Sequence, residues 1–184
     1  MEPPLLDFGG PAPLVHFQPA NGFPPATYRP LLDLLAPSCH VVCIPPRALW
    51  PGVGDPPEAA GSWHELADDL LDGLRAHELR DVIAIGHSFG GVASLLAVLK
   101  EPERFRALAL LDPTILPPST MEEVRQARAR GDEARFALVE GALRRRSRFF
   151  SDAEAYVYFR SKQLFADWPE TALGYYAAGA VREA

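Results

Sequence analysis

The chain has 184 residues, 48% of them hydrophobic and 23% charged, a composition typical of a globular protein with a substantial buried core. Its formal net charge of −6 at pH 7 argues against a nucleic acid or an anionic membrane as partner, and no apolar run approaches the ~20 residues of a transmembrane helix. The first ten residues lack the basic start and apolar stretch of a signal peptide, so we expect a cytoplasmic protein.

Strand-like and helix-like segments alternate along the first part of the chain. Strands are expected at 13–17, 40–44, 81–86 and 107–112, and helices with apolar residues at helical spacing at 28–35, 62–74 and 92–99. Such alternation indicates an α/β fold, with a mostly parallel sheet covered by helices on both faces.

The pattern changes after Pro118, beyond which no further strand is legible. Helices are expected near 120–130, 133–148, 152–165 and 168–181, and capping boxes are formed by Ser62 with Glu65, Thr120 with Glu123, and Ser151 with Glu154. We therefore divide the chain into an α/β core at 1–118 and a helical cap at 119–184.

The two cysteines, Cys39 and Cys43, lie four residues apart around a strand-like segment, too far apart to form a disulfide. We expect both to be small buried side chains rather than a redox pair. No cluster of cysteine and histidine has the spacing of metal ligands, so the sequence predicts no metal, and it points to no cofactor.

One segment has the pattern of a catalytic site. Gly86-His87-Ser88-Phe89-Gly90 joins a continuous apolar strand to a helix. A turn from strand to helix within one residue forces the serine into a strained backbone conformation and exposes its hydroxyl at the carboxyl edge of the sheet. Gly86 and Gly90 let the two segments pass closely, and Gly91 eases the packing of the helix. The alternative is a glycine-rich turn with an incidental serine. We consider this the weaker interpretation, because a strand precedes the segment and a helix follows it.

This segment resembles the nucleophile elbow of the α/β-hydrolase superfamily. Asn21-Gly22-Phe23-Pro24 is similar to the His-Gly-Phe-Pro loop that supplies an oxyanion donor in these enzymes, with Asn21 in place of the usual histidine. The resemblance extends over about residues 5–118 and more loosely over the cap.

The resemblance implies a role for particular residues. Ser88 would be the nucleophile, and the backbone N–H groups of Phe23 and Phe89 would form the oxyanion hole. A serine at this position implies acyl transfer through an acyl-enzyme, with a small-molecule ester, thioester or similar compound as substrate. It argues against epoxide hydrolysis and dehalogenation, for which this superfamily uses an aspartate.

The other members of a catalytic triad are not evident. In this superfamily the histidine follows the serine, whereas all five histidines of the chain, His16, His40, His64, His77 and His87, precede it. Asp112 ends a strand at the correct edge of the sheet, where it could be the triad acid or could shape a turn before Pro113; we favour the turn.

One explanation accounts for both the missing histidine and the uncertain acid. We interpret the chain as the N-terminal part of a hydrolase, lacking roughly 80–100 residues that carry the last strands with the acid and histidine loops, and expect it to be inactive by itself. A catalytically dead relative that keeps the fold as a ligand pocket is the alternative, and an unstable fragment with an exposed apolar sheet edge is a third. The sequence does not indicate the oligomeric state.

The cap segment is rich in aromatic residues. They line an acyl pocket in one interpretation and simply hold the cap together in the other, which we favour for most of them. The aromatic residues are Phe136, Phe149, Phe150, Tyr156, Tyr158, Phe159, Phe165, Trp168, Tyr175 and Tyr176. The basic run at 144–148 could attract an acidic substrate, although a solvated helix end is the favoured interpretation.

Overall fold

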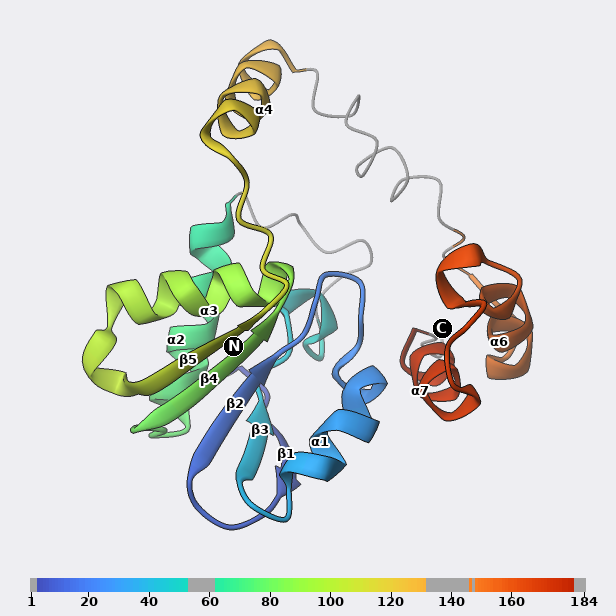
Figure 1. Ribbon diagram of the computed structural model, residues 1–184, viewed down its shortest axis with the longest axis horizontal. Helices are drawn as coiled ribbons and strands as arrows, with labels where there is room; N and C mark the ends of the chain where they lie inside the picture. The colour runs from blue at the N-terminus through green and yellow to red at the C-terminus, as the bar shows by residue number, and fades with distance from the viewer. Residues whose placement is uncertain (1–2, 53–61, 132–145, 147, 181–184) are drawn as a thin grey trace.

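The computed structural model describes residues 3–52, 62–131, 146 and 148–180. Its centre is a five-stranded sheet with the order β1-β3-β2-β4-β5. The strands are β1 (Leu6–Gly9), β2 (Leu14–Gln18), β3 (His40–Cys43), β4 (Val82–His87) and β5 (Phe105–Leu111). Strands β2 to β5 pair in parallel, whereas β1 pairs antiparallel with β3, so the predicted mostly parallel sheet is confirmed (Figure 1).

Strand β1 is the one strand that the sequence did not predict. It is four residues long, and its side chains are exposed or half-buried. So short a segment at the edge of a sheet shows neither a clear alternation nor a continuous apolar run, and its extended form comes from pairing with β3.

Helices cover both faces of the sheet. On one face α2 (Trp63–Ala76) and α3 (Phe89–Lys100) bury a core with Ile44 and Val82, and on the other α1 (Arg29–Leu35) places Leu32 against Val15 and Phe17 (Figure 1). The predicted two-sided packing is therefore confirmed. Because both faces of the central strands are covered, their carboxyl ends are the accessible edge at which side chains can meet a ligand.

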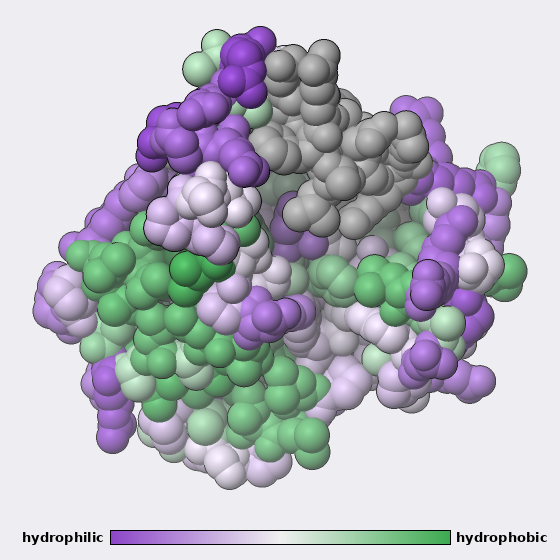
Figure 2. Space-filling view, turned by 45° about the horizontal axis from the view of Figure 1, so that its top comes forward, coloured by the Kyte–Doolittle hydropathy of each residue, from purple (hydrophilic) through white to green (hydrophobic). Residues whose placement is uncertain are grey.

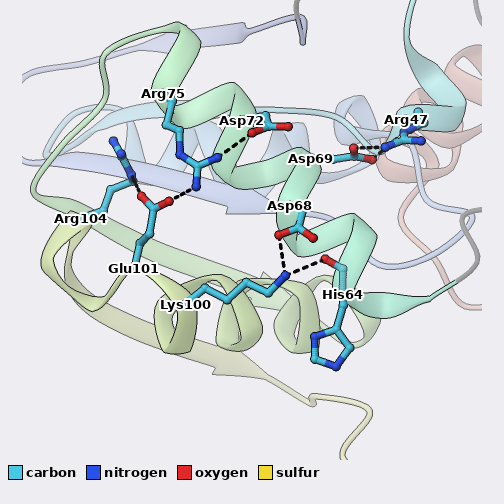
Figure 3. Close-up of polar contacts among 9 residues, drawn as sticks. All are labelled: Arg47, His64, Asp68, Asp69, Asp72, Arg75, Lys100, Glu101 and Arg104. Atoms are coloured by element: carbon cyan, nitrogen blue, oxygen red, sulfur yellow. Dashed lines mark hydrogen bonds and ion pairs between the residues drawn. The ribbon is translucent and has the colours of Figure 1, made fainter.

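Polar contacts fasten α2 to its neighbours (Figure 3). Lys100 at the end of α3 pairs with Asp68, and Arg47 forms an ion pair with Asp69, whose side chain is only 9% exposed. Glu101 accepts from Arg75 and, at 2.8 Å, from Arg104. Partial burial opposes ionisation of Glu101, but these two arginines lower its pKa overall. The C-terminal end of α3 is thus joined to α2 by two ion pairs.

Strand β5 lies at an edge of the sheet and is poorly covered. Ala107, Ala109 and Leu111 alternate along one of its faces, and all three are exposed. Figure 2 shows a broad hydrophobic area on the left, the side on which Figure 1 places β5 and α3. The predicted exposed apolar edge is therefore present.

Beyond the sheet the described chain is helical, with α4 (Pro118–Arg130), α6 (Asp152–Arg160) and α7 (Glu170–Ala180). The side chain of Ser62 accepts from the N–H of Glu65 and that of Ser151 from the N–H of Glu154, which confirms the N-cap serine of two capping boxes. The carboxylate of Glu154 accepts from the N–H of Phe150, one residue before the N-cap. The helix predicted over 133–148 lies mostly outside the described residues, as does Phe136. The division into a core and a cap stays a prediction.

The capping box predicted at Thr120 and Glu123 is wrong. Helix α4 begins two residues earlier, at Pro118, so Thr120 lies inside its first turn. Proline is well suited to the first helical position because its backbone angle is already helical and its missing N–H would have no partner there.

Candidate active site

Ser88 occupies a single-residue elbow between β4 and α3. Its backbone angles are φ 52° and ψ −119°, a positive φ that a residue with a side chain rarely adopts. The strain predicted from the motif is therefore present. Such strain costs on the order of 1–3 kcal/mol and persists only where the surrounding structure enforces it.

Backbone segments packed closely against each other, without side chains between them, permit this conformation. A Cβ atom on Gly86 would lie 2.5 Å from the carbonyl oxygen of Gly90, and one on Gly90 would lie 2.4 Å from the carbonyl oxygens of Gln18 and Pro19. On Gly91 it would lie 3.0 Å from the carbonyl oxygen of Gly86. Gly86 and Gly90 are thus required by close approach, as predicted, and a side chain at Gly91 would fit tightly.

The chain after β5 completes the elbow. The N–H of Ser88 donates to the carbonyl of Leu111 at 2.9 Å, and the carbonyl of Ser88 accepts from the N–H of Thr114 at 3.3 Å. The two hydroxyl groups, Ser88 Oγ and Thr114 Oγ1, are hydrogen-bonded at 3.0 Å. Thr114 was missed at the sequence level, because a threonine in a proline-rich loop 26 residues after the serine carries no signal of its own.

None of the five histidines, all of which lie in described segments, forms a hydrogen bond with Ser88. His40 pairs with Asp7, the ring of His77 bonds to the carbonyl of Pro3, and the side chain of His64 is exposed. His87, next to the serine, turns to Tyr28, with 2.7 Å between Nδ1 and the phenol oxygen. The structure thus shows no base beside the serine hydroxyl in the described residues.

His16 is the most deeply buried of these side chains, with 0% exposure on β2. Its Nε2 atom accepts the N–H of Ile44 at 3.0 Å, so the neutral ring carries its proton on Nδ1, for which the described residues supply no partner. Burial lowers the pKa of His16 from 6.5 to about 3. This histidine links β2 to the end of β3.

The two predicted oxyanion donors differ in their surroundings. Phe89 is the first residue of α3, so its N–H has no acceptor within the helix and lies at the positive end of the helix dipole. The N–H of Phe23 donates to the carbonyl of Ala20 at 3.1 Å in a tight turn. An oxyanion would have to share or replace that bond, and both roles stay predictions.

Asp112 follows β5 with a φ of 44°, its side chain exposed and Pro113 next in the chain. Aspartate is one of the few non-glycine residues that tolerate this conformation, because its short side chain can bond to nearby backbone. The geometry agrees with the interpretation of Asp112 as a turn residue, and a role as triad acid stays a prediction.

Aromatic side chains join the loop of Phe23 to the cap helices. The ring of Phe23 stacks on Trp168 at 5.9 Å and lies 5.4 Å from that of Tyr176, while Phe165 and Tyr176 are buried. Most rings of this segment contact one another, whereas Phe150 is 96% exposed. These contacts agree with the interpretation that the cap aromatics serve chiefly to hold the cap together and to the loop.

The basic run at 144–148 is described only at Arg146 and Arg148. Arg146 pairs with Glu154 at 2.6 Å and lies over the ring of Phe149. The positive charge of Arg146 is thus paired with a carboxylate of the protein itself.

The described residues contain no group of three or more His, Cys, Asp or Glu side chains placed to hold a metal ion. Cys39 and Cys43 are both free thiols, and burial raises the pKa of Cys43. In the same part of the chain no helix is both long and apolar enough to cross a bilayer.

Comparisons with known proteins agree with this geometry. The structure of an E-2-(acetamidomethylene)succinate hydrolase superimposes with a TM-score of 0.66 at 20% identity, over 95% of this chain and 59% of that one. An alpha/beta hydrolase from Novosphingobium aromaticivorans gives a TM-score of 0.61 at 23% identity, over 95% and 57%. The chain thus spans less than two thirds of the length of these proteins.

Two comparisons rest on sequence. Ethanol acetyltransferase 1 of Kluyveromyces marxianus is 38% identical over 50 residues, which are 27% of this chain and 14% of that protein. A sequence model of the alpha/beta hydrolase family matches residues 14–183, nearly the whole chain and all of the elbow. The chain therefore belongs to the alpha/beta hydrolase family.

Proposed function

We propose that this chain carries the nucleophile of a serine hydrolase that acts on small acyl compounds, such as esters or thioesters, through an acyl-enzyme. The observation that carries the proposal is the strained elbow, which places the Ser88 hydroxyl at the carboxyl edge of the sheet, where the N–H of Phe89 begins α3. The names of an acetyltransferase and of a hydrolase among the similar proteins support acyl transfer as the reaction class.

In the proposed reaction, Oγ of Ser88 forms a bond to the acyl carbon as its proton passes to a base. The carbonyl oxygen becomes an oxyanion, which accepts from the N–H of Phe89 and from the N–H of Phe23 once the latter releases Ala20. The tetrahedral intermediate then collapses, the bond to the leaving group breaks and that group departs with a proton. Water attacks the acyl-enzyme in the same way and restores the serine.

The member of the catalytic triad that the described residues do not supply is the general base. Since Ser88 bonds to Thr114 and to none of the histidines, we propose that the complete site takes its histidine and acid from residues other than those placed here. A serine without a base is a weak nucleophile near neutral pH, so the 184-residue chain alone has negligible turnover.

A second candidate is a non-catalytic module that uses the same fold to bind a ligand. The observation that favours it is the same pairing of the Ser88 and Thr114 hydroxyls, which leaves the serine in a neutral hydrogen bond. In either case we propose a small-molecule ligand and a cytoplasmic location. We also propose that neither nucleic acid nor a membrane is a partner, which the net charge of −6 supports.

Labelling by a fluorophosphonate, followed by intact mass, tests the proposal, with Ser88→Ala as the control. We expect slow labelling confined to Ser88 and no turnover of a nitrophenyl ester above that of Ser88→Ala. Rapid stoichiometric labelling would show that this chain already holds a base and would overturn our account of the missing member. Complete resistance of Ser88 would favour the binding module.

A further inference from the structure

One phenol joins the two segments on which the proposed site depends. The N–H of Ala20, just before the predicted oxyanion loop, donates to the Tyr28 hydroxyl at 3.1 Å. The same oxygen lies 2.7 Å from Nδ1 of His87, the residue before Ser88. Tyr28 ends the 3-10 helix Pro25–Tyr28 and precedes α1, so it comes from neither of the segments that it connects.

The ring is held on more than one side, which fixes where the hydroxyl can lie. It packs against Phe17 with 4.6 Å between ring centroids and meets the imidazole of His87 edge-on at 5.8 Å. Phe17 is fully buried in the core of the sheet. The hydroxyl position is therefore fixed mainly from the core of the sheet, and the ring of Phe23 in the loop adds a looser contact at 6.5 Å.

The direction of the hydrogen bonds follows from the protons that are present. Burial raises the pKa of Tyr28 to about 12, against the opposing effect of the bond from Ala20, so the phenol keeps its proton near neutral pH. Its oxygen already accepts from Ala20, and Nδ1 of His87 is the only acceptor within reach of its proton in the described part of the chain. Tyr28 thus donates to Nδ1, and the neutral imidazole carries its proton on Nε2.

We propose that Tyr28 is a positioning residue that ties the oxyanion loop to the nucleophile elbow and holds His87 in its Nε2–H tautomer. This inference rests on the proposed function, because the proposed function is what assigns the loop of Phe23 and the elbow of Ser88 to one site. It also gives a reason why the histidine beside the nucleophile is not its base. With Nδ1 accepting from Tyr28 and Nε2 protonated, the neutral ring has no free lone pair for the Ser88 proton.

The test is Tyr28→Phe in the full chain, which keeps the ring and removes the hydroxyl. Tyr175→Phe, which removes a hydroxyl from an exposed ring, is the matched control. The first readout is the ring nitrogens of His87 by long-range proton–nitrogen correlation at a pH of about 8, above the ordinary imidazole pKa. His87→Gln assigns the signals. We expect the unsubstituted chain and Tyr175→Phe to show an unprotonated Nδ1 with a protonated Nε2, and Tyr28→Phe to show exchange between tautomers.

The second readout is hydrogen exchange at the amide of Ala20. Loss of a hydrogen bond worth about 1 kcal/mol predicts exchange roughly fivefold faster in Tyr28→Phe, with the amide of Val42 in β3 unchanged. A protonated Nδ1 in the unsubstituted chain, or no change of either signal in Tyr28→Phe, would overturn the inference. A general acceleration that includes Val42 would mean that the hydroxyl only stabilises the fold. Fluorophosphonate labelling of Ser88 in the same samples tests the proposed function separately, since neither readout depends on activity.

Discussion

The hydroxyl groups of Ser88 and Thr114 are hydrogen-bonded at 3.0 Å, although 26 residues separate them in the chain. We expect Thr114→Val to lower the free energy of unfolding by about 1 kcal/mol, because one half-buried hydrogen bond is lost. Thr114→Ser keeps the hydroxyl and is the control. Urea unfolding measures both. A loss in Thr114→Ser without a loss in Thr114→Val would mean that the methyl group, not the hydroxyl, matters.

The backbone contact at Gly90 leads to a sharper prediction. Gly90→Ala places a Cβ atom 2.4 Å from two carbonyl oxygens, so we expect a loss of about 3 kcal/mol or failure to fold. In Gly174→Ala the new Cβ meets nothing within 4 Å on α7. That control should gain about 0.5–1 kcal/mol, the usual preference for alanine over glycine in a helix. Similar melting temperatures for the two variants would contradict the tight elbow.

The stability of the chain should fall in acid because of His16. Burial lowers the pKa of His16 from 6.5 to about 3, so between these values the unfolded chain binds a proton that the folded chain does not. The free energy of unfolding therefore decreases as the pH falls through this window, on the order of 4–5 kcal/mol in all. We expect His16→Gln to flatten this dependence and the exposed control His64→Gln to leave it unchanged. Parallel pH profiles for all three proteins would show that other groups dominate.

Arg160 should stabilise the segment that connects α6 to α7. Its Nη1 atom donates to the carbonyls of Phe165 and Trp168, both at 2.9 Å, and of Ala166 at 3.2 Å. Its Nη2 atom donates to the hydroxyl of Tyr156 at 3.2 Å. A lysine has a single nitrogen and cannot keep both sets of bonds, so we expect Arg160→Lys to cost about 1–3 kcal/mol and to shift the fluorescence of Trp168. The exposed Arg148→Lys is the control. An unchanged spectrum and melting curve in Arg160→Lys would contradict this role.

The uncovered edge at β5 predicts self-association that depends on concentration. Ala109 is exposed in the middle of this strand, and charged side chains are what natural proteins place on such edges. We expect Ala109→Lys to reduce the sedimentation coefficient at high concentration. Leu34→Lys, at a leucine of α1 that is 78% exposed, adds the same charge elsewhere. An equal reduction in both would indicate a general effect of charge.

Long apolar runs made the central strands predictable from sequence. In β4, Val82 and Ala84 are buried on one face of the sheet, and Ile83 and Ile85 are half-buried on the other. The elbow was predictable for a different reason: its glycines and serine follow one another at a fixed spacing between an apolar strand and a helix, although Gly90 is required by a contact with Gln18 and Pro19 on another segment. Thr114 and Tyr28 were not, since each acts through a contact that only the assembled sheet creates. The apolar periodicity assigned Tyr28 to a helix stripe, whereas its ring lies on Phe17 and its hydroxyl is used between two loops.

The residues that hold the elbow in place are synthesised after the elbow itself. The N–H of Ser88 reaches its acceptor, Leu111, at the end of β5, and Thr114 closes the same turn from beyond that strand. The positive φ of Ser88 is therefore stabilised by residues synthesised more than 20 positions later, and the glycines alone only permit it. Contacts of this separation form late because the intervening chain must first be ordered. A nascent chain that ends before β5 therefore holds the whole Gly-x-Ser-x-Gly motif without the two backbone hydrogen bonds, to Leu111 and from Thr114, that close its turn.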